Sequence, residues 1–153
     1  MSKVMDMQYK LYDRMRHKRA FEVARQEGTA HDFEALRGHR QALVVTFKRS
    51  GEPVPTPVNF GLDDEGRLYF RSEPHVAKIR RIQGDPHVRV CPCNMRAKPT
   101  GPLAEGRARI LPPEEEERAH AVIAANWTKP MAVFERGGDR FGLPLSYVEV
   151  TPA

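Results

Sequence analysis

The sequence predicts a small, mainly antiparallel β-barrel of about six strands with flanking helices. Short runs of β-branched and aromatic residues recur from residue 41 onward, turn sequences separate them, and only three or four helical segments accompany them. At 153 residues the chain is most simply one domain, large enough to bury about two-thirds of the surface of its unfolded form. We expect the strands to pair in meander order.

The first 40 residues predict a helical extension, followed by a barrel domain over residues 41–153. A basic helix is expected over residues 10–28, with an apolar stripe on one face, and a second helix over residues 29–38 that ends at Gly38. The basic helix has two interpretations, a solvated face or a nucleic-acid arm. The second rests only on charge, because no cluster of base-stacking aromatic residues lies beside the helix.

Six strands are expected in the barrel domain, and the second carries prolines at positions 53, 55 and 57. Proline cannot donate to a ladder, so this strand has a free edge or leaves donor positions open. The pattern predicts helices over residues 75–84 and 112–127, and a loop around Gly137 and Gly138. The expected strands span residues 41–49, 54–62, 67–72, 87–94, 103–111 and 145–152.

Charge and hydropathy limit the partners and the compartment. The net charge of +5 and the pI near 9.5 favour anionic partners, which include nucleic acid, phosphate-bearing cofactors and acidic substrates. No apolar run approaches the roughly 20 residues that cross a bilayer, and the N-terminus lacks the apolar core of a signal peptide. We therefore expect a cytoplasmic protein.

The two cysteines, Cys91 and Cys93, lie two positions apart on a predicted strand. Such residues face the same side, and a disulfide between them would be strained. A zinc site with His87 is the alternative, but this spacing matches no usual ligand pattern. Two reduced, buried strand cysteines are the better interpretation.

The chain offers few side chains for catalysis, so we expect a bound cofactor to supply any chemistry. It has no nucleophile elbow, paired-carboxylate signature or zinc-helix motif, and the acidic run at 114–117 is typical of a helix start. Cations gather where the third strand passes into the 75–84 helix, with Lys78 and Arg81 on one helix face. They form either a phosphate site at a helix N-terminus or a solvated cationic face.

Four segments in fixed order resemble one family. They read LVVTFKRSGEPVPTPV, LYFRSE, AKIRRIQGDPHVRVCPC and KPTGPLAEGRARIL, and the terminal YVEVTP also fits. About half of the chain, from Leu43 to about Leu111, is similar to the PPOX-class (pyridoxamine 5'-phosphate oxidase-like) F420-dependent oxidoreductases of the FMN-binding split-barrel superfamily. The resemblance implies a split β-barrel and a homodimer with the cofactor at the subunit interface.

The resemblance also implies a cofactor site, whose core is a phosphate held chiefly by Lys78. The cofactor is coenzyme F420, a deazaflavin, with FMN as the alternative. Two positions depart from the family: Val76 stands where flavin-binding relatives often carry serine or arginine, and Asn59 where many close relatives carry tryptophan. The implied site residues are Pro55, Thr56, Pro57, Val58 and Asn59 beside the ring or polyol, Arg71 and Ser72 toward the phosphate, Lys78 and Arg81 on it, and Lys98, Pro99 and Thr100 from the partner subunit.

The implied activity is hydride transfer from reduced F420 to an activated double bond or a quinone-like acceptor. An FMN-dependent oxidase or reductase on the same fold is one alternative. A non-catalytic flavin- or haem-binding protein is another, since both fit a barrel with few catalytic side chains.

Overall fold

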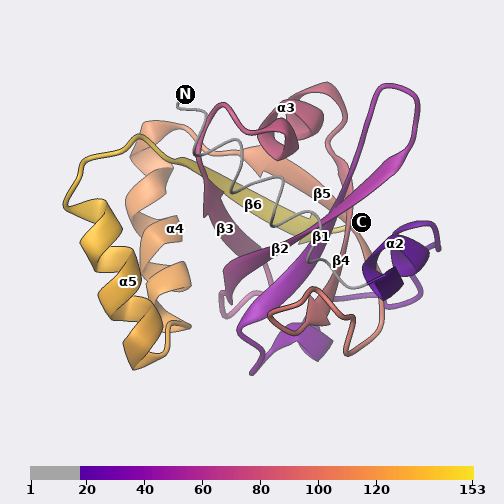
Figure 1. Cartoon of the computed structure of the whole chain (residues 1–153), viewed down its shortest axis with the longest axis horizontal. Coiled ribbons are helices and arrows are strands. Elements are labelled where there is room, and N and C mark those ends of the chain that lie inside the picture. Colours follow the sequence, from indigo (N-terminus) through magenta and orange to yellow (C-terminus); the bar gives the residue numbers. More distant parts are fainter. Residues whose placement is uncertain (1–17) are drawn as a thin grey trace.

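Six antiparallel strands close into a barrel in the computed structural model, which describes residues 18–153 (Figure 1). All six expected strands are confirmed, each with ends within two residues of the prediction. No helix among the described residues is long and apolar enough to span a membrane. The strands are β1 (Gln41–Phe47), β2 (Pro53–Leu62), β3 (Leu68–Ser72), β4 (His87–Cys93), β5 (Ala104–Ile110) and β6 (Ser146–Pro152).

The predicted meander order is wrong. Around the barrel the order is β1-β2-β3-β6-β5-β4, so β6 lies between β3 and β5, and β4 pairs with β1. The expected pairing of β4 with β5 is confirmed. Local sequence specifies a strand and its turns, whereas the choice of partner across a closed sheet depends on contacts between distant segments.

The strand β2 changes partner along its length. Its first part, Pro53–Asn59, lies opposite β1, and its last residues, Phe60–Leu62, lie opposite β3. Within the described chain, the half that carries the prolines is therefore paired on one side only, which confirms the free edge expected from Pro55 and Pro57. This unpaired edge is where the barrel is split.

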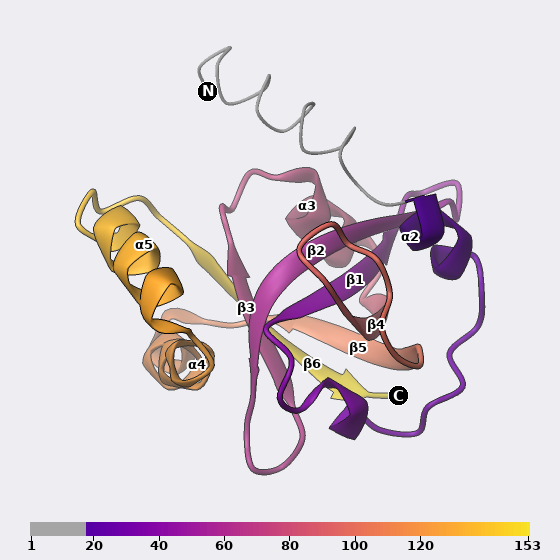
Figure 2. The same cartoon turned by 60° about the horizontal axis from the view of Figure 1, so that its bottom comes forward.

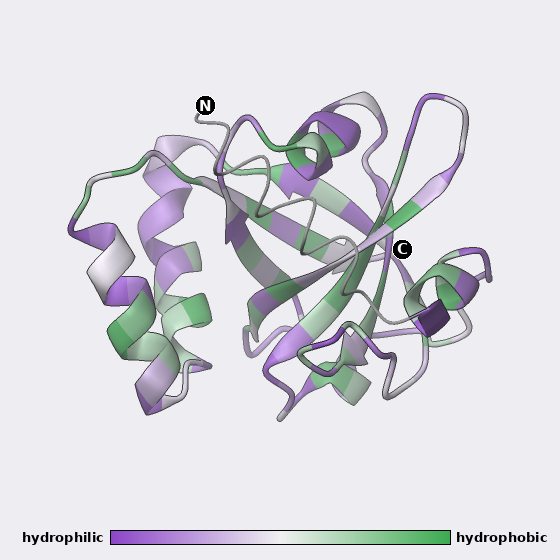
Figure 3. Ribbon diagram, viewed as in Figure 1, coloured by the Kyte–Doolittle hydropathy of each residue, from purple (hydrophilic) through white to green (hydrophobic). Residues whose placement is uncertain are grey.

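Alternating side chains fill the barrel and cover its outside. From β1, Val44 points into the core with Phe60 and Phe70, while Leu43 points out toward the helix α2 (Lys18–Ala24). Successive residues along the strands accordingly alternate in hydropathy where one face meets solvent (Figure 3). The strand β1 is buried on both faces, and apart from Gln41 and Thr46 all of its residues are apolar.

The helices lie on opposite sides of this barrel. The helices α4 (Pro113–Ala125) and α5 (Lys129–Asp139) stand together on one side, with α2 on the other (Figures 1 and 2). The short helix α3 (Ala77–Gly84) follows β3, as predicted. The first part of the predicted basic helix lies outside the described residues, and α2 is its described end.

Two predictions about helices are wrong. Residues 29–38 form only a short 3-10 turn, η1 (Glu34–Leu36), because Thr29 and Ala30 both donate backbone hydrogen bonds to the carbonyl oxygen of Leu103 and so stay extended. Leu36 of η1 belongs to the barrel core. The division of the chain at residue 40 stays a prediction.

The second error is the expected loop around Gly137 and Gly138, which lies in α5. The helix begins at Thr128, whose hydroxyl accepts a hydrogen bond from the Met131 backbone, and proline stands in its first turn. These are ordinary start signals. The glycine pair in the last turn concealed them, because glycine is a poor helix former.

Cys91 and Cys93 are both free and buried on the outer face of β4, beneath α2, as expected. Burial raises the pKa of each thiol to about 12. At neutral pH both groups are therefore protonated and act as small apolar side chains.

The helix α4 packs closely on β2 at Gly61. A Cβ atom built at Gly61 would lie 2.2 Å from the carbonyl oxygen of Val122 and 2.6 Å from its carbonyl carbon. Only glycine, which has no side chain, allows the two backbones to come this close. Gly61 therefore lets α4 pack directly on β2, next to the unpaired edge of that strand.

We predict that Gly61→Ala lowers the free energy of unfolding by about 1–3 kcal/mol, because strand and helix must separate. The matched control is Gly137→Ala in α5, where an added Cβ would meet nothing within 4 Å. It should leave stability unchanged or raise it by up to about 1 kcal/mol. Urea unfolding followed by the fluorescence of Trp127, the sole tryptophan, measures both. A Gly61→Ala protein as stable as the wild type would contradict the close packing.

Candidate functional site

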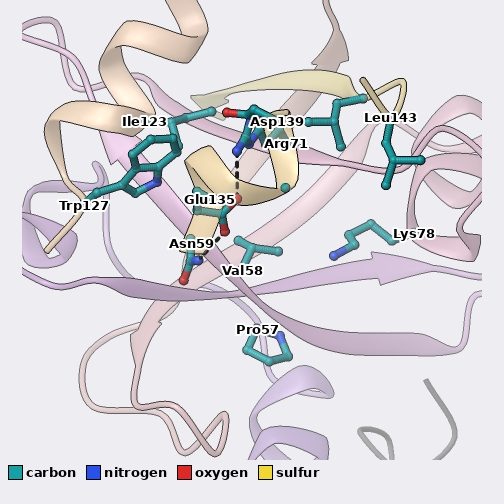
Figure 4. Close-up of a pocket in the computed structure, with 12 residues that line it drawn as sticks. Pro57, Val58, Asn59, Arg71, Lys78, Ile123, Trp127, Glu135, Asp139 and Leu143 are labelled. Atoms are coloured by element: carbon teal, nitrogen blue, oxygen red, sulfur yellow. Dashed lines mark hydrogen bonds and ion pairs between the residues drawn. The ribbon is translucent and has the colours of Figure 1, made fainter. Parts of the chain in front are cut away.

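A cavity of about 290 Å³ lies at the split edge of β2, enclosed by β3, α3, the end of α4 and α5 (Figure 4). The structure brings five of the expected site residues together in its wall. Three lie on the half-paired strand, one ends β3 and one lies in the first turn of α3. They are Pro57, Val58, Asn59, Arg71 and Lys78.

Arg71 is the central charged group of this cavity. Its side chain is only 9% exposed, and its Nη2 and Nη1 donate to Glu135 Oε2 at 2.7 Å and Asp139 Oδ1 at 2.9 Å. The guanidinium also donates to the Tyr147 hydroxyl at 3.4 Å and lies 5.3 Å from the centre of the Trp127 ring. Both terminal nitrogens of the Arg71 guanidinium, Nη1 and Nη2, are thus bound by carboxylates of α5.

The surroundings of Arg71 keep it charged. Burial by itself lowers the pKa of Arg71, but hydrogen bonds to Tyr147, Glu135 and Asp139 outweigh it and raise the pKa above its usual range. The buried cation is compensated by two carboxylates, as a buried charge requires.

Glu135 joins the two strand walls of the cavity. While Oε2 accepts from Arg71, Oε1 accepts from the Asn59 side-chain amide at 3.4 Å, and both contacts are drawn in Figure 4. Asn59 in turn accepts from the Gln41 side chain at 3.1 Å. One carboxylate of α5 therefore links β2 to β3 where the two strands are not paired with each other.

Lys78 approaches the cavity from the side opposite Trp127 (Figure 4). Its Nζ lies 5.8 Å from the centre of the Phe70 ring. The N-cap of α3 is Val76, whose side chain has no oxygen that could accept from the first backbone N–H groups of the helix. A helix N-terminus without a side-chain cap, next to a lysine, suits an anionic group.

Seven expected residues do not line the cavity in the described chain. Four lie on β2, β3 and α3: Pro55 is buried opposite Val45 of β1, Thr56 donates to the Val44 carbonyl, Ser72 pairs with Ser146 of β6, and Arg81 donates to the Thr46 hydroxyl at 2.6 Å. Burial, followed by the nearby Arg80, lowers the pKa of Arg81.

The other three, Lys98, Pro99 and Thr100, follow a tight turn after β4, and Pro99 lies in an isolated antiparallel bridge opposite Cys93. The Lys98 N–H donates to the Asn94 side chain at 3.0 Å, and Thr100 donates to the Pro92 carbonyl at 2.9 Å. The expectation that these three reach the cavity of a second subunit stays a prediction.

Sequence reasoning missed the acidic and aromatic part of the wall. Trp127 follows α4, and Glu135 and Asp139 lie on α5, in the segment expected to be a loop. The start signals of α5, Thr128 with proline two residues later, were the cue that would have revealed a helix there. The partners of its carboxylates are 64 and 68 residues away, which no local pattern indicates.

A second, more open hollow of about 360 Å³ adjoins the first behind Arg71. Here the His120 ring lies 2.9 Å from the Tyr147 hydroxyl, and Glu116 and Glu117 of α4 line the outer rim. No group of three or more His, Cys, Asp or Glu side chains in residues 18–153 is arranged to hold a metal ion.

The family profile described as pyridoxamine 5'-phosphate oxidase matches residues 29–149, from just before η1 into β6. The chain belongs to the pyridoxamine 5'-phosphate oxidase family. The family's split barrel is the fold found here, and the matched range includes every residue that lines the cavity. No curated protein matches the chain.

Solved structures share this fold at low sequence identity. A protein of unknown function from Agrobacterium tumefaciens has a TM-score of 0.59 at 21% identity; the alignment covers 88% of this chain and 54% of that one, so this chain spans about half its length. A FAD-binding protein from Mesorhizobium loti has a TM-score of 0.55 at 19% identity, covering 78% and 83%. HutZ, the heme storage protein from Vibrio cholerae, has a TM-score of 0.59 at 12% identity, covering 78% and 86%. These likenesses establish the fold.

We predict that Arg71→Met lowers the free energy of unfolding by about 1–3 kcal/mol, because Glu135 and Asp139 lose their partner while partly shielded from water. Arg71→Lys, which keeps the charge without the planar fork, should lose less. Urea unfolding of the two variants and the wild type tests this. Equal stability of Arg71→Met and the wild type would show that the guanidinium does not hold α5.

Proposed function

We propose that the chain is an oxidoreductase that uses the reduced form of coenzyme F420, a deazaflavin, to reduce an activated double bond or a quinone-like acceptor. The proposal rests mainly on one cavity, which is lined by the open edge of β2 and by Lys78 at the N-terminus of α3. The chain that contains this cavity belongs to the pyridoxamine 5'-phosphate oxidase family. The preference for F420 over FMN rests on the sequence motifs that the chain shares with F420-dependent members.

The residues present fit a flat, anionic cofactor. Pro57 and Val58 are apolar residues of β2 that line the cavity, so a ring can lie against this part of the strand, and Asn59 adds a polar group at its end. Lys78, with the uncapped start of α3, offers charge-assisted donors for a phosphate. When bound in its reduced form, F420 would supply the hydride and be left as the oxidised deazaflavin, while the protein would bind and orient it.

The other walls would orient the acceptor and exclude water. Trp127, Leu143 and Leu145 add apolar surface on the side away from β2. Holding cofactor and acceptor in contact within a shielded site is the principal way such a chain accelerates the reaction. We infer a cytoplasmic setting, a reducing compartment that suits two free thiols.

We infer a homodimer with two equivalent cofactor sites. A volume of about 290 Å³ is at the lower end for a ligand site, which fits half of a cleft that a second subunit completes. Lys98, Pro99 and Thr100 are the residues we assign to the partner's side. A light-scattering mass of one chain, at micromolar concentration with cofactor bound, would exclude this arrangement.

Two alternative functions have support among the structural relatives. The FAD-binding relative supports an FMN-dependent oxidase or reductase, and the heme storage relative supports a non-catalytic haem- or flavin-binding protein. Cofactor retention and turnover separate them.

Parallel titrations of F420 and FMN, followed by their own fluorescence, test the proposal. We expect F420 to bind more tightly than FMN, and reduced F420 to be oxidised by a quinone or an enone only when the protein is present. Tight FMN binding without F420 binding would move the assignment to a flavoprotein. Binding of haem alone would move it to a haem-binding protein.

The phosphate assignment predicts the effect of Lys78→Ala. A charge-assisted contact contributes roughly 1.5–3 kcal/mol, so the dissociation constant for F420 should rise about ten- to a hundredfold. Stability should change little, because the substitution is on a short surface helix. Arg80→Ala is the matched control: Arg80 lies on α3, exposed and outside the cavity. If both variants lose the same affinity for F420, Lys78 contributes only general positive charge and does not contact the phosphate.

A further inference from the structure

Helix α5 is attached to the barrel by charge rather than by a buried face. None of its residues, all of which are described, is buried. Val133 and Phe134 are 75% and 80% exposed. Figure 3 shows a hydrophobic band in the first half of α5. Side-chain hydrogen bonds of Glu135 and Asp139 join α5 to the strands β2 and β3.

These two carboxylates neutralise the cavity. The cavity wall contains two cationic residues, Arg71 and Lys78, and two anionic residues, Glu135 and Asp139, so its net formal charge is zero. Both outer nitrogens of the Arg71 fork are engaged, at 2.7 and 2.9 Å. Arg71 therefore already has the bidentate anionic partners that a phosphate would otherwise provide.

An anionic ligand that enters this cavity meets the carboxylates as competitors. At separations of a few ångströms in a poorly solvated site, like charges repel strongly. The ligand can take Arg71 only if Glu135 and Asp139 withdraw. If they stay, Lys78 and the start of α3 are left to hold the ligand alone.

The construction of α5 allows such a withdrawal. The turn that carries Asp139 also contains Gly137 and Gly138, each of which lowers helix stability by about 1 kcal/mol relative to alanine. Glu135 and Asp139 are themselves 25% and 35% exposed, so water can solvate them as they leave Arg71. Since α5 has no buried residue, its own side chains lose little buried surface when the helix moves.

We propose that α5 is an acidic lid that selects for anionic ligands: Glu135 and Asp139 occupy Arg71, and a phosphate-bearing ligand gains Arg71 by displacing them. The proposal rests on the cofactor site proposed above and adds its gating residues. A neutral ligand with the same ring has no group to exchange for the carboxylates and leaves the lid closed.

The decisive comparison pairs phosphate-bearing ligands with their phosphate-free cores. FMN and riboflavin differ only in the phosphate, and F420 is paired with its 8-hydroxy-5-deazariboflavin core, which lacks the phosphodiester and the oligoglutamate tail. Each ligand is titrated into the wild type and into the double variant Glu135→Gln/Asp139→Asn. Removing the competing charges should tighten binding of the phosphate-bearing members about tenfold or more. The phosphate-free members should change less than twofold.

A second double variant controls for net charge. Glu27→Gln/Asp64→Asn removes two exposed carboxylates that lie outside the cavity wall. It should bind all four ligands as the wild type does. If Glu135→Gln/Asp139→Asn binds the phosphate-bearing ligands no more tightly than the wild type does, the lid proposal is wrong. If both double variants gain the same affinity, the gain comes from long-range electrostatics and the lid proposal is also wrong.

A measurement without flavin separates the lid from the cofactor assignment. Hydrogen exchange of residues 129–139 is followed in the wild type with and without saturating pyrophosphate. The lid predicts severalfold faster exchange in α5 with pyrophosphate, and a smaller increase in Lys78→Ala. If no flavin or deazaflavin binds but this response is present, the proposed function fails and the lid stands. If α5 does not respond, the lid is wrong, whichever cofactor binds.

Discussion

The buried guanidinium of Arg71 is the interaction on which the helical side of the molecule depends. It extends from β3 next to β6, and its partners come from β6, α4, the segment after α4 and α5. A cation that is 9% exposed must be compensated. The carboxylates that compensate it are the ones that place α5 over the cavity, so the same ion pairs shape both the fold and the site.

The open edge of β2 is the second constraint. Prolines cannot donate to a neighbouring strand, and the half of β2 that carries them pairs only with β1. Beyond Asn59 the strand turns to β3, and Gly61 lets α4 approach from outside. The cavity exists because the barrel is closed everywhere except along this half-strand, and because α3 brings Lys78 to it.

The sequence predicts the pieces of the fold better than their arrangement. Strands such as β1 were predictable because β-branched runs between turn residues carry local information. Their order around the barrel was not, because β6 enters between β3 and β5 through contacts between distant segments. Residues 29–38 looked helical by local pattern, but long-range backbone hydrogen bonds to Leu103 hold their start extended.

The site divides in the same way. Pro57, Val58, Asn59, Arg71 and Lys78 were expected from the family resemblance, and they line one cavity. Glu135, Asp139 and Trp127 were missed, since two glycines made α5 resemble a loop and since their partners are distant in sequence. Lys98, Pro99 and Thr100 depend on a second subunit and stay predictions.

A crystal structure of the protein with F420 bound tests the central claim most directly. The account predicts the ring along Pro57–Asn59 and the phosphate within hydrogen-bond distance of Lys78 Nζ at the start of α3. A cofactor bound elsewhere, for example in the hollow lined by Glu116, Glu117 and His120, with Lys78 making no contact to phosphate, would contradict it.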